Sequence, residues 1–215
     1  MPRRKSAQSS ISTEPEPQRR STPPTLGRPR DETADAAILD AAVKLLDKRG
    51  YQSMTIDEIA ALAGVGKQTL YRRWPSKAAV VLEALTRRTA AEVVAPDTGS
   101  VVKDVRSLLR SAFAALRAGR QKVVVSLMAE AQLSEEFAIA FREQFIARRR
   151  DALTSLLQRG IDRGELASDT DVEFLADMIY GPMWYRLLNR HAPIDDRFAD
   201  SLSAFVLNQI VTTDR

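Results

Sequence analysis

The sequence predicts an all-α protein of about nine helices, in which a small three-helix domain precedes a larger helical domain. Apolar residues recur at spacings of three and four along most of the chain after residue 31, as amphipathic helices require. The chain has 215 residues, of which 44% are apolar, and this suits one or two compact domains. The stretch 94–100, which contains Pro96 and Gly99, interrupts the helical pattern and separates the two domains.

We expect three parts: an arm over residues 1–30, a domain with its connecting helix over 31–93, and a second domain over 94–215. The arm holds seven Lys or Arg and two Glu, a net charge of +5, and is rich in Ser and Pro. Its few apolar side chains cannot offset the entropy lost on ordering, so we expect a disordered arm. An anionic partner would therefore meet the N-terminal end of the chain.

The arm ends in Gly27, Arg28, Pro29 and Arg30, which resemble the Gly-Arg-Pro core of an AT-hook, although the leading arginine is missing. A flat cationic strip of this kind fits a narrow minor groove. The alternative is a basic arm that only improves solubility, and the sequence leaves both interpretations open. On the first interpretation, Arg28 and Arg30 contact DNA.

The first predicted helix begins near Asp31, where acidic residues suit a helix N-terminus, and ends at Gly50. The second begins with Thr55 and Glu58, a capping-box pair in which each side chain binds the backbone N–H of the other. A third short helix over Lys67–Arg73 follows the turn at Gly64. This order of short helices predicts a helix-turn-helix.

Residues 64–77 contain four basic side chains and no acidic one. A helix that lies in the major groove needs polar and cationic side chains on its outer face and apolar anchors beneath, and Leu70 and Trp74 provide such anchors. Lys77 follows Ser76, a predicted N-cap, and is placed to neutralise a phosphate. The side chains predicted to face the groove and the DNA backbone are Lys67, Gln68, Thr69, Tyr71, Arg72 and Arg73.

This segment has two alternative interpretations. A run of charges on a short helix is often a solvated face, and spacing alone does not decide against it. A phosphate-binding loop is disfavoured, because the Walker pattern requires Gly where Ala61 stands and Ser or Thr where Gln68 stands.

The pattern T-x-x-E-I-A-x-x-A-G-V-x-x-x-T-L-Y-x-x-W-x-x-K, from Thr55 to Lys77, resembles the DNA-binding signature of TetR-family transcriptional regulators. The resemblance extends upstream to about Glu32 and fits a helical remainder. It implies contacts to bases and phosphates from Lys67, Gln68, Thr69, Tyr71 and Arg73, and phosphate contacts from Thr55 and Lys77. Gly66 departs from the usual capping Ser or Thr, and Trp74 replaces the commoner Phe.

The second domain has the periodicity of further helices, including a long one over residues 135–163. The resemblance implies that the last two helices pair with those of a second copy in a four-helix interface. The residues assigned to this homodimer interface are Leu175, Ile179, Leu187, Phe198, Leu202, Phe205 and Val206. Two recognition helices one DNA turn apart would then read a palindromic operator.

A pocket for a small-molecule effector is expected in the second domain, and an apolar or aromatic ligand suits the few inward charges. Ordinary core packing explains the same residue types equally well. The residues proposed to line the pocket are Phe113, Met128, Phe141, Phe145, Tyr180 and Trp184.

Composition narrows the function classes. The chain has no Cys and a single His, so thiol catalysis, disulfides, thiolate metal sites and histidine clusters are excluded, and we expect no cofactor and no metal. No nucleophile, base and orienting group stand out, so we expect no enzyme. The absence of a long apolar run or signal segment predicts a cytoplasmic protein without membrane contact.

The function predicted from these observations is a homodimeric repressor that a ligand releases from its operator. The alternative is an architectural DNA-binding protein that is indifferent to sequence, which would rely on the arm and on phosphate contacts.

Overall fold

The computed structural model describes residues 32–89 and 95–208, the last four by their backbone and Ala204 as the last side chain. All regular structure in this part of the chain is helical, as predicted. Arg28 and Arg30 lie outside the described residues, as do the side chains of Phe205 and Val206. The helices are α1 (Glu32–Ser53), α2 (Ile56–Ala63), α3 (Lys67–Tyr71), α4 (Lys77–Thr89), α5 (Val101–Ala115), α6 (Gln121–Leu133), α7 (Glu135–Phe141), α8 (Arg148–Asp162), α9 (Val172–Asn189) and α10 (Asp196–Asn208), with π-helical segments at Leu116–Arg120 and Arg142–Ala147.

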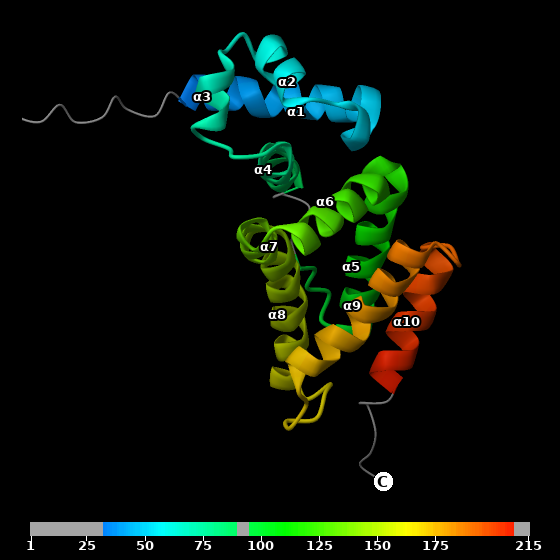
Figure 1. Cartoon of the computed structure of the whole chain (residues 1–215). Coiled ribbons are helices and arrows are strands. Elements are labelled where there is room, and N and C mark those ends of the chain that lie inside the picture. Colours follow the sequence, from blue (N-terminus) through cyan, green and yellow to red (C-terminus); the bar gives the residue numbers. More distant parts are fainter. Residues whose placement is uncertain (1–31, 90–94, 209–215) are drawn as a thin grey trace, which may run out of the picture. The chain divides into compact units, whose positions relative to one another are not determined.

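Helices α1, α2 and α3 form the helix-turn-helix domain (Figure 1). Thr55 caps α2: its hydroxyl accepts a hydrogen bond from the Glu58 N–H at 3.2 Å, and the Glu58 carboxylate accepts one from the Thr55 N–H at 2.9 Å. Gly64 then ends α2 in the left-handed region, with φ 68°. The capping box and the glycine stop fix the angle at which α3 leaves α2.

The segment α1 contains a break at Gly50, the residue at which the sequence predicted the end of the helix. Gly50 has φ 74° and ψ 168°, a conformation that is essentially restricted to glycine, and the chain resumes a helical turn as far as Ser53. This kink turns Tyr51 and Met54 inward, where both are buried. The regular helix therefore ends at the glycine, as predicted, and a separate turn follows it.

Helix α4 packs against α1 on one side and against α6, α7 and the segment Arg142–Ala147 on the other (Figure 1). It starts at Ser76, whose hydroxyl accepts a hydrogen bond from the Ala79 N–H at 3.1 Å. Most of its side chains are buried, among them Val80, Val81 and Leu82. Because α4 is buried on several sides, it connects α1 to the helices that cover its other side.

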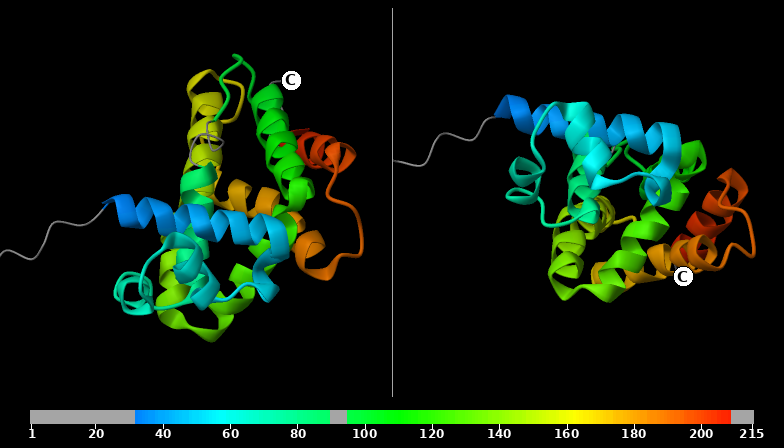
Figure 2. Two further views of the ribbon diagram at one scale, coloured as in Figure 1. Left: turned by 90° about the horizontal axis from the view of Figure 1, so that it is seen from above. Right: turned by 45° about the horizontal axis from the view of Figure 1, so that its top comes forward.

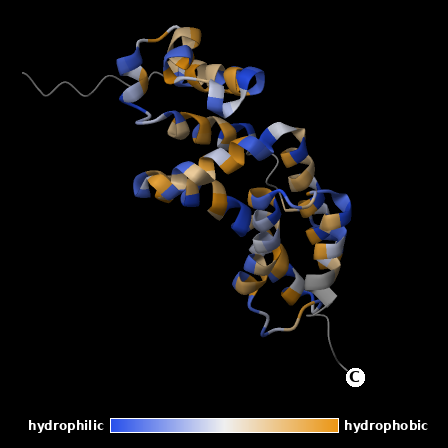
Figure 3. Cartoon of the chain, turned by 45° about the vertical axis from the view of Figure 1, so that its right-hand side comes forward, coloured by the Kyte–Doolittle hydropathy of each residue, from blue (hydrophilic) through white to orange (hydrophobic). Residues whose placement is uncertain are grey.

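The long helix predicted over 135–163 is present as α7, the π-helical segment and α8 in sequence. Helix α8 packs against α5 and α9, and α10 packs against α5 and α9 (Figure 2). The Phe113 and Phe198 rings stack with centroids 5.5 Å apart and join α5 to α10. Hydrophobic and hydrophilic stretches of ribbon alternate along most helices, as amphipathic helices require (Figure 3).

Within residues 32–89 and 95–208, no helix is both long enough and apolar enough to cross a membrane.

Candidate nucleic-acid interface and ligand cavity

The outer face of α3 is the candidate nucleic-acid interface. Lys67, Gln68, Tyr71 and Arg72 are exposed, and Tyr71 leaves 51% of its surface accessible. Leu70, on the opposite face of the helix, is fully buried. The helix thus presents two cations, an amide and a phenol, the donors and acceptors that base edges and phosphates bind.

The helix is anchored from beneath by Leu70 and Trp74. The indole N–H of Trp74 donates a hydrogen bond to Glu83 on α4 at 2.7 Å, and only 6% of the Trp74 surface is accessible. The Val65 N–H donates to the Ala60 carbonyl at 3.0 Å, which closes the turn between α2 and α3. These contacts hold a helix of five residues that could not persist alone in water.

Lys67 and Thr55 lie at the rim of this surface. The Lys67 ammonium is 2.5 Å from the Asp57 carboxylate, but both side chains are more than half exposed, so solvent screens the pair. Thr55 is exposed, and its hydroxyl also lies within 3.1 Å of Glu58. The Thr55 backbone N–H, followed by the Thr55 hydroxyl, lowers the pKa of the Glu58 carboxyl. The cap therefore keeps a carboxylate close to the position expected to meet a phosphate.

Thr69 is half-buried, so it is less accessible than Lys67, Gln68 and Tyr71 of α3 and Arg72, which follows the helix directly.

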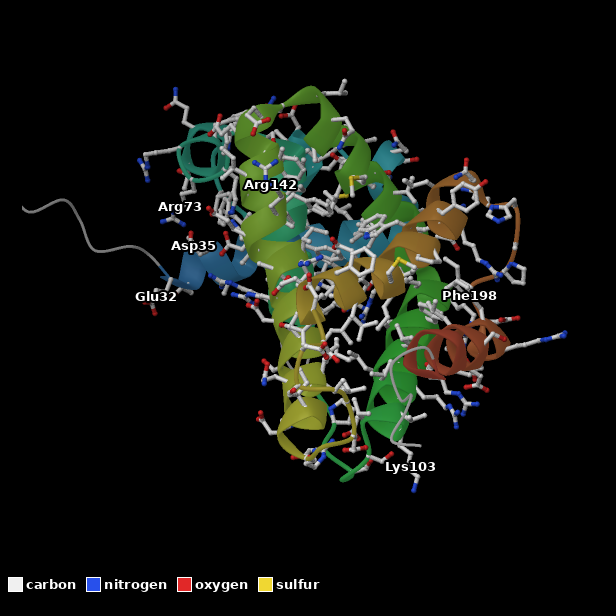
Figure 4. The ribbon with its side chains drawn as sticks, turned by 90° about the horizontal axis from the view of Figure 1, so that it is seen from below. Glu32, Asp35, Arg73, Lys103, Arg142 and Phe198 are labelled. Carbon is white, nitrogen blue, oxygen red and sulfur yellow. The ribbon has the colours of Figure 1, made fainter. Side chains whose placement is uncertain are left out.

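Arg73 does not lie on the exposed face of α3, where the sequence predicted it. Its guanidinium forms an ion pair with Asp35 near the start of α1, and each of the two side chains is 16% exposed (Figure 4). A partly buried ion pair costs free energy to break, because the remaining charge is left without compensation. The structure thus gives Arg73 a role in tying the end of the recognition segment to α1.

Lys77, which the sequence predicts to contact a phosphate, has partners within the chain. Its ammonium donates hydrogen bonds to the carbonyls of Tyr51 at 2.9 Å and Met54 at 3.2 Å. It also lies 4.3 Å from the centroid of the Tyr51 ring, a cation–π contact. Helix ends leave carbonyls without intrahelical partners, and Lys77 satisfies those at the end of α1.

A cavity of about 990 Å³, which is within the size range of small-molecule sites, lies mainly among α5, α6, α8 and α9. Four of the residues expected to line a pocket lie on its wall: Met128, Phe145, Tyr180 and Trp184. The other two, Phe113 and Phe141, are absent from this wall and belong to the buried core, with 0% and 2% of their surface accessible. Leu85 and Thr89 bring the end of α4 to the same cavity.

The cavity also contains arginines that the sequence did not predict there, Arg120, Arg149 and Arg150. The Arg149 guanidinium lies 3.6 Å from the centroid of the Phe145 ring. The hydroxyl of Tyr180 donates to the Arg149 carbonyl at 2.9 Å, and burial raises the pKa of Tyr180 to about 12. The sequence could have indicated this contact, because Arg149 follows Phe145 by four residues and residues at that spacing are neighbours on a helix.

The residues assigned to a dimer interface are buried within the protomer. Leu175, Ile179, Leu187, Phe198 and Leu202 each have 8% or less of their surface accessible, because α9 and α10 pack against α8 and α5. The exposed apolar side chains of α9 are different ones, Phe174, Met178, Tyr185 and Leu188, with 41–63% of their surface accessible. Spacings of four, seven and three place these four on one face of the helix.

Two protein families match the chain. The family described as "Bacterial regulatory proteins, tetR family" matches residues 38–84, which span most of α1 through much of α4. The family described as "Tetracyclin repressor-like, C-terminal domain" matches residues 95–206.

Individual proteins agree with these families. The chain is 38% identical over 176 residues to the uncharacterized HTH-type transcriptional regulator YdeS of Bacillus subtilis, across 82% of this chain and 89% of that protein. It is 30% identical over 181 residues to the DNA-binding transcriptional repressor TetR of Mycobacteroides abscessus, across 83% and 94%. The solved TetR family transcription regulator SCO0332 superimposes with a TM-score of 0.72 at 31% identity, across 82% and 98%. The chain, with its helix-turn-helix and its helical second domain, therefore belongs to the TetR family of DNA-binding transcriptional regulators.

Proposed function

We propose that this regulator is a homodimeric repressor that binds a palindromic operator through α3 of each protomer and leaves it when a small molecule fills the cavity. The observation that carries the proposal is the place of α4. Its first half holds the helix-turn-helix through Lys77 and Glu83, and its end contributes Leu85 and Thr89 to the cavity wall. One helix therefore contacts both the helix-turn-helix, here called the reading head, and the proposed ligand site.

Helix α6 provides a second connection between the two parts. Val124 and Met128 lie on the cavity wall. Ser126 and Glu130 meet α1: the Tyr51 hydroxyl donates to Glu130 at 2.9 Å, and the Gln52 amide donates to Ser126 at 3.2 Å. A ligand that binds one placement of α4 and α6 better than another would shift the placement of the head, and without such a difference it would shift nothing.

The exposed apolar stripe of α9, formed by Phe174, Met178, Tyr185 and Leu188, supports the dimer. Its four large side chains lie along one face of a helix of 18 residues. Apolar surface in such an arrangement marks a contact site more often than an ordinary solvated face. A second copy related by a twofold axis would present the same stripe, so that each stripe covers the other.

Repression is supported by the relative from Mycobacteroides abscessus, which is named as a DNA-binding transcriptional repressor. The outer face of α3 supports specific readout, because Gln68 suits an adenine edge and Arg72 a guanine edge or a phosphate.

Selection on random-sequence duplex DNA at physiological salt tests the proposal. The expected result is a palindromic consensus with half-sites about 34–36 Å apart, or one helical turn. The matched variants are Arg72→Gln, which should relax the preference at one position in each half-site, and Arg142→Gln, an exposed arginine outside the head that should leave the consensus unchanged.

Binding without an enriched sequence would contradict the proposal and favour the architectural alternative, whose affinity falls steeply with salt at every sequence.

A further inference from the structure

A second, smaller cavity adjoins the large one. It has a volume of about 350 Å³ and shares Thr89, Arg149 and Ala152 with the wall of the large cavity. Its remaining lining differs in character, since four of the five other residues are polar or charged. The four polar or charged residues are Thr86, Arg148, Asp151 and Ser155, and the fifth residue is Ala95.

Thr86, on α4, is the most informative of these residues. Its side-chain oxygen is buried and has no hydrogen-bond partner, and only 7% of the residue surface is accessible. Buried hydroxyls nearly always have a partner, because an unsatisfied one costs about 1–3 kcal/mol. By contrast, the neighbouring Thr89 hydroxyl donates to the Leu85 carbonyl at 2.9 Å. An unpartnered hydroxyl on a cavity wall indicates that something else completes its hydrogen bonding.

The small cavity is cationic overall. Arg148 and Arg149 contribute two positive charges and Asp151 one negative charge, a net charge of +1. Arg149 stands where the two cavities meet, and its guanidinium is held there by the Phe145 ring and by a hydrogen bond of 2.9 Å to the Phe145 carbonyl. The larger cavity beyond it is lined mainly by apolar side chains, among them Leu108, Val124 and Trp184.

From this arrangement we infer that the two cavities form one site for an amphipathic anion, whose apolar body fills the large cavity and whose anionic head group lies in the small one. The inference rests on the proposed ligand-binding function and specifies the class of ligand. The head group would accept hydrogen bonds from Thr86 on α4 and from Arg148 and Arg149 on α8. An apolar or aromatic molecule without charge, the ligand expected from the sequence, would leave this compartment unused.

The proposed position of the head group would connect two helices, one of which also contacts the helix-turn-helix. Thr86 belongs to α4, the helix that also holds the reading head, whereas both arginines belong to α8. A bound anion would therefore bridge these two helices through charge-assisted hydrogen bonds, which are stronger than neutral ones.

Calorimetric titration of the full chain with decanoate, decyl phosphate and decan-1-ol tests the inference, with each probe kept below its micelle-forming concentration. The three probes share an apolar tail and differ in the head group. We expect the better of the two anions to bind about tenfold or more tightly than the alcohol, and higher salt to weaken the anion alone. The comparison of carboxylate with phosphate identifies the preferred anion.

Two variants locate the head group. Thr86→Val removes the hydroxyl at nearly constant volume, and Arg148→Gln removes an exposed charge from the small cavity. Each should weaken the preferred anion about fivefold or more and leave decan-1-ol within about twofold. Arg142→Gln is the matched control: it removes a charge from the same run of helix, away from both cavities, and should change neither affinity.

Thr86→Val should also fold at least as well as the parent, because it removes an unsatisfied polar group, and a thermal melt verifies this.

Three results would overturn the inference: equal binding of anion and alcohol, equal effects of Arg148→Gln and Arg142→Gln, or no binding of any probe. Selection on duplex DNA is run in parallel without the probes. If selection gives a palindromic consensus and any of these three results is also obtained, the repressor proposal is kept and the inference of an amphipathic anion is rejected. Absence of a consensus would count against the repressor proposal whichever probes bind.

Discussion

At the scale of single residues, the basic side chains of the segment 64–77 divide into two groups with different roles. Lys67 on α3 and Arg72 directly after it are exposed, whereas Arg73 and Lys77 have partners inside the domain. Positive charge in the sequence attracts an anion only if the side chain reaches solvent. The two internal cations instead hold the ends of α1 against the segment that follows α3, and this difference in role leads to two predictions.

Arg73→Gln and Asp35→Asn should produce the same defect. Each removes the same partly buried ion pair, and we expect a loss of about 1–3 kcal/mol in the free energy of unfolding. Denaturant titration of each variant measures this loss, and selection on duplex DNA measures the base preference, which should be retained at every position.

A base-reading role for Arg73 would produce a different pair of results. Arg73→Gln would relax the preference at one position, and Asp35→Asn, on α1, would leave the DNA preference and the stability unchanged.

Lys77→Met and Lys67→Met separate an internal cation from a solvent-exposed one. Lys77→Met removes two hydrogen bonds to helix-end carbonyls, so it should lower the melting temperature and leave the salt dependence of operator binding unchanged. Lys67→Met should leave the melting temperature nearly unchanged and reduce the salt slope of operator binding by about one. Thermal melts and binding isotherms at several salt concentrations measure both quantities, and a reduced slope for Lys77→Met would support the phosphate contact predicted from the sequence.

At the scale of the helices, capping residues and glycines predicted where the first helices begin and end. The pair Thr55 and Glu58 predicted the start of α2, and Gly64 predicted its end, because both depend on contacts within a few residues. Gly50 gave the same signal for α1, and the regular helix breaks there, although a short helical turn follows. Whether a chain leaves or re-enters a helix after a glycine depends on what the next residues pack against, and here Tyr51 and Met54 are drawn into the core.

The same limit applies to the faces of α9 and α10. Periodicity identified their apolar residues, but α9 carries apolar side chains nearly all round, so spacing could not separate the inward face from the outward one. Leu175, Ile179 and Leu187 face the protomer core because α8 and α10 cover them. The cavity residues posed a similar problem, since Phe141 and Phe145 lie one turn apart on one helix and only Phe145 reaches the cavity wall.

Gly50→Ala tests the kink in α1. Alanine at φ 74° and ψ 168° is strained although no neighbouring atom lies within 4 Å of the added Cβ, so we expect a loss of about 1–3 kcal/mol in the free energy of unfolding. Gly66→Ser is the matched control, because φ is −72° there, the space is equally open, and Ser suits the N-cap of α3. Denaturant titration should show it to be neutral or slightly stabilising, and equal losses in both variants would contradict the assigned strain.

At the scale of the whole molecule, the proposed homodimer would bring two copies of α3, a helix of five residues, to one operator. Helix α9 offers a surface for this pairing, because Phe174, Met178, Tyr185 and Leu188 are exposed in the part of the chain that the structure describes. Gly181 lies between Met178 and Tyr185 on the same face, and no atom lies within 4 Å of a Cβ built there. A facing helix could approach closely at that point.

The double variant Phe174→Glu and Tyr185→Glu tests whether this stripe joins the protomers. Two charges placed on a self-complementary face meet two more from the partner, so we expect the dimer to dissociate and operator affinity to fall. Sedimentation velocity measures the oligomeric state, and a gel-shift titration measures the affinity. Leu133→Glu is the control, since Leu133 is 83% exposed at the end of α6, away from α9. Loss of the dimer in the control alone would assign the interface to the α6 end, whereas loss in the double variant alone, with folding retained by circular dichroism, would make α9 the element that spaces two reading heads along DNA.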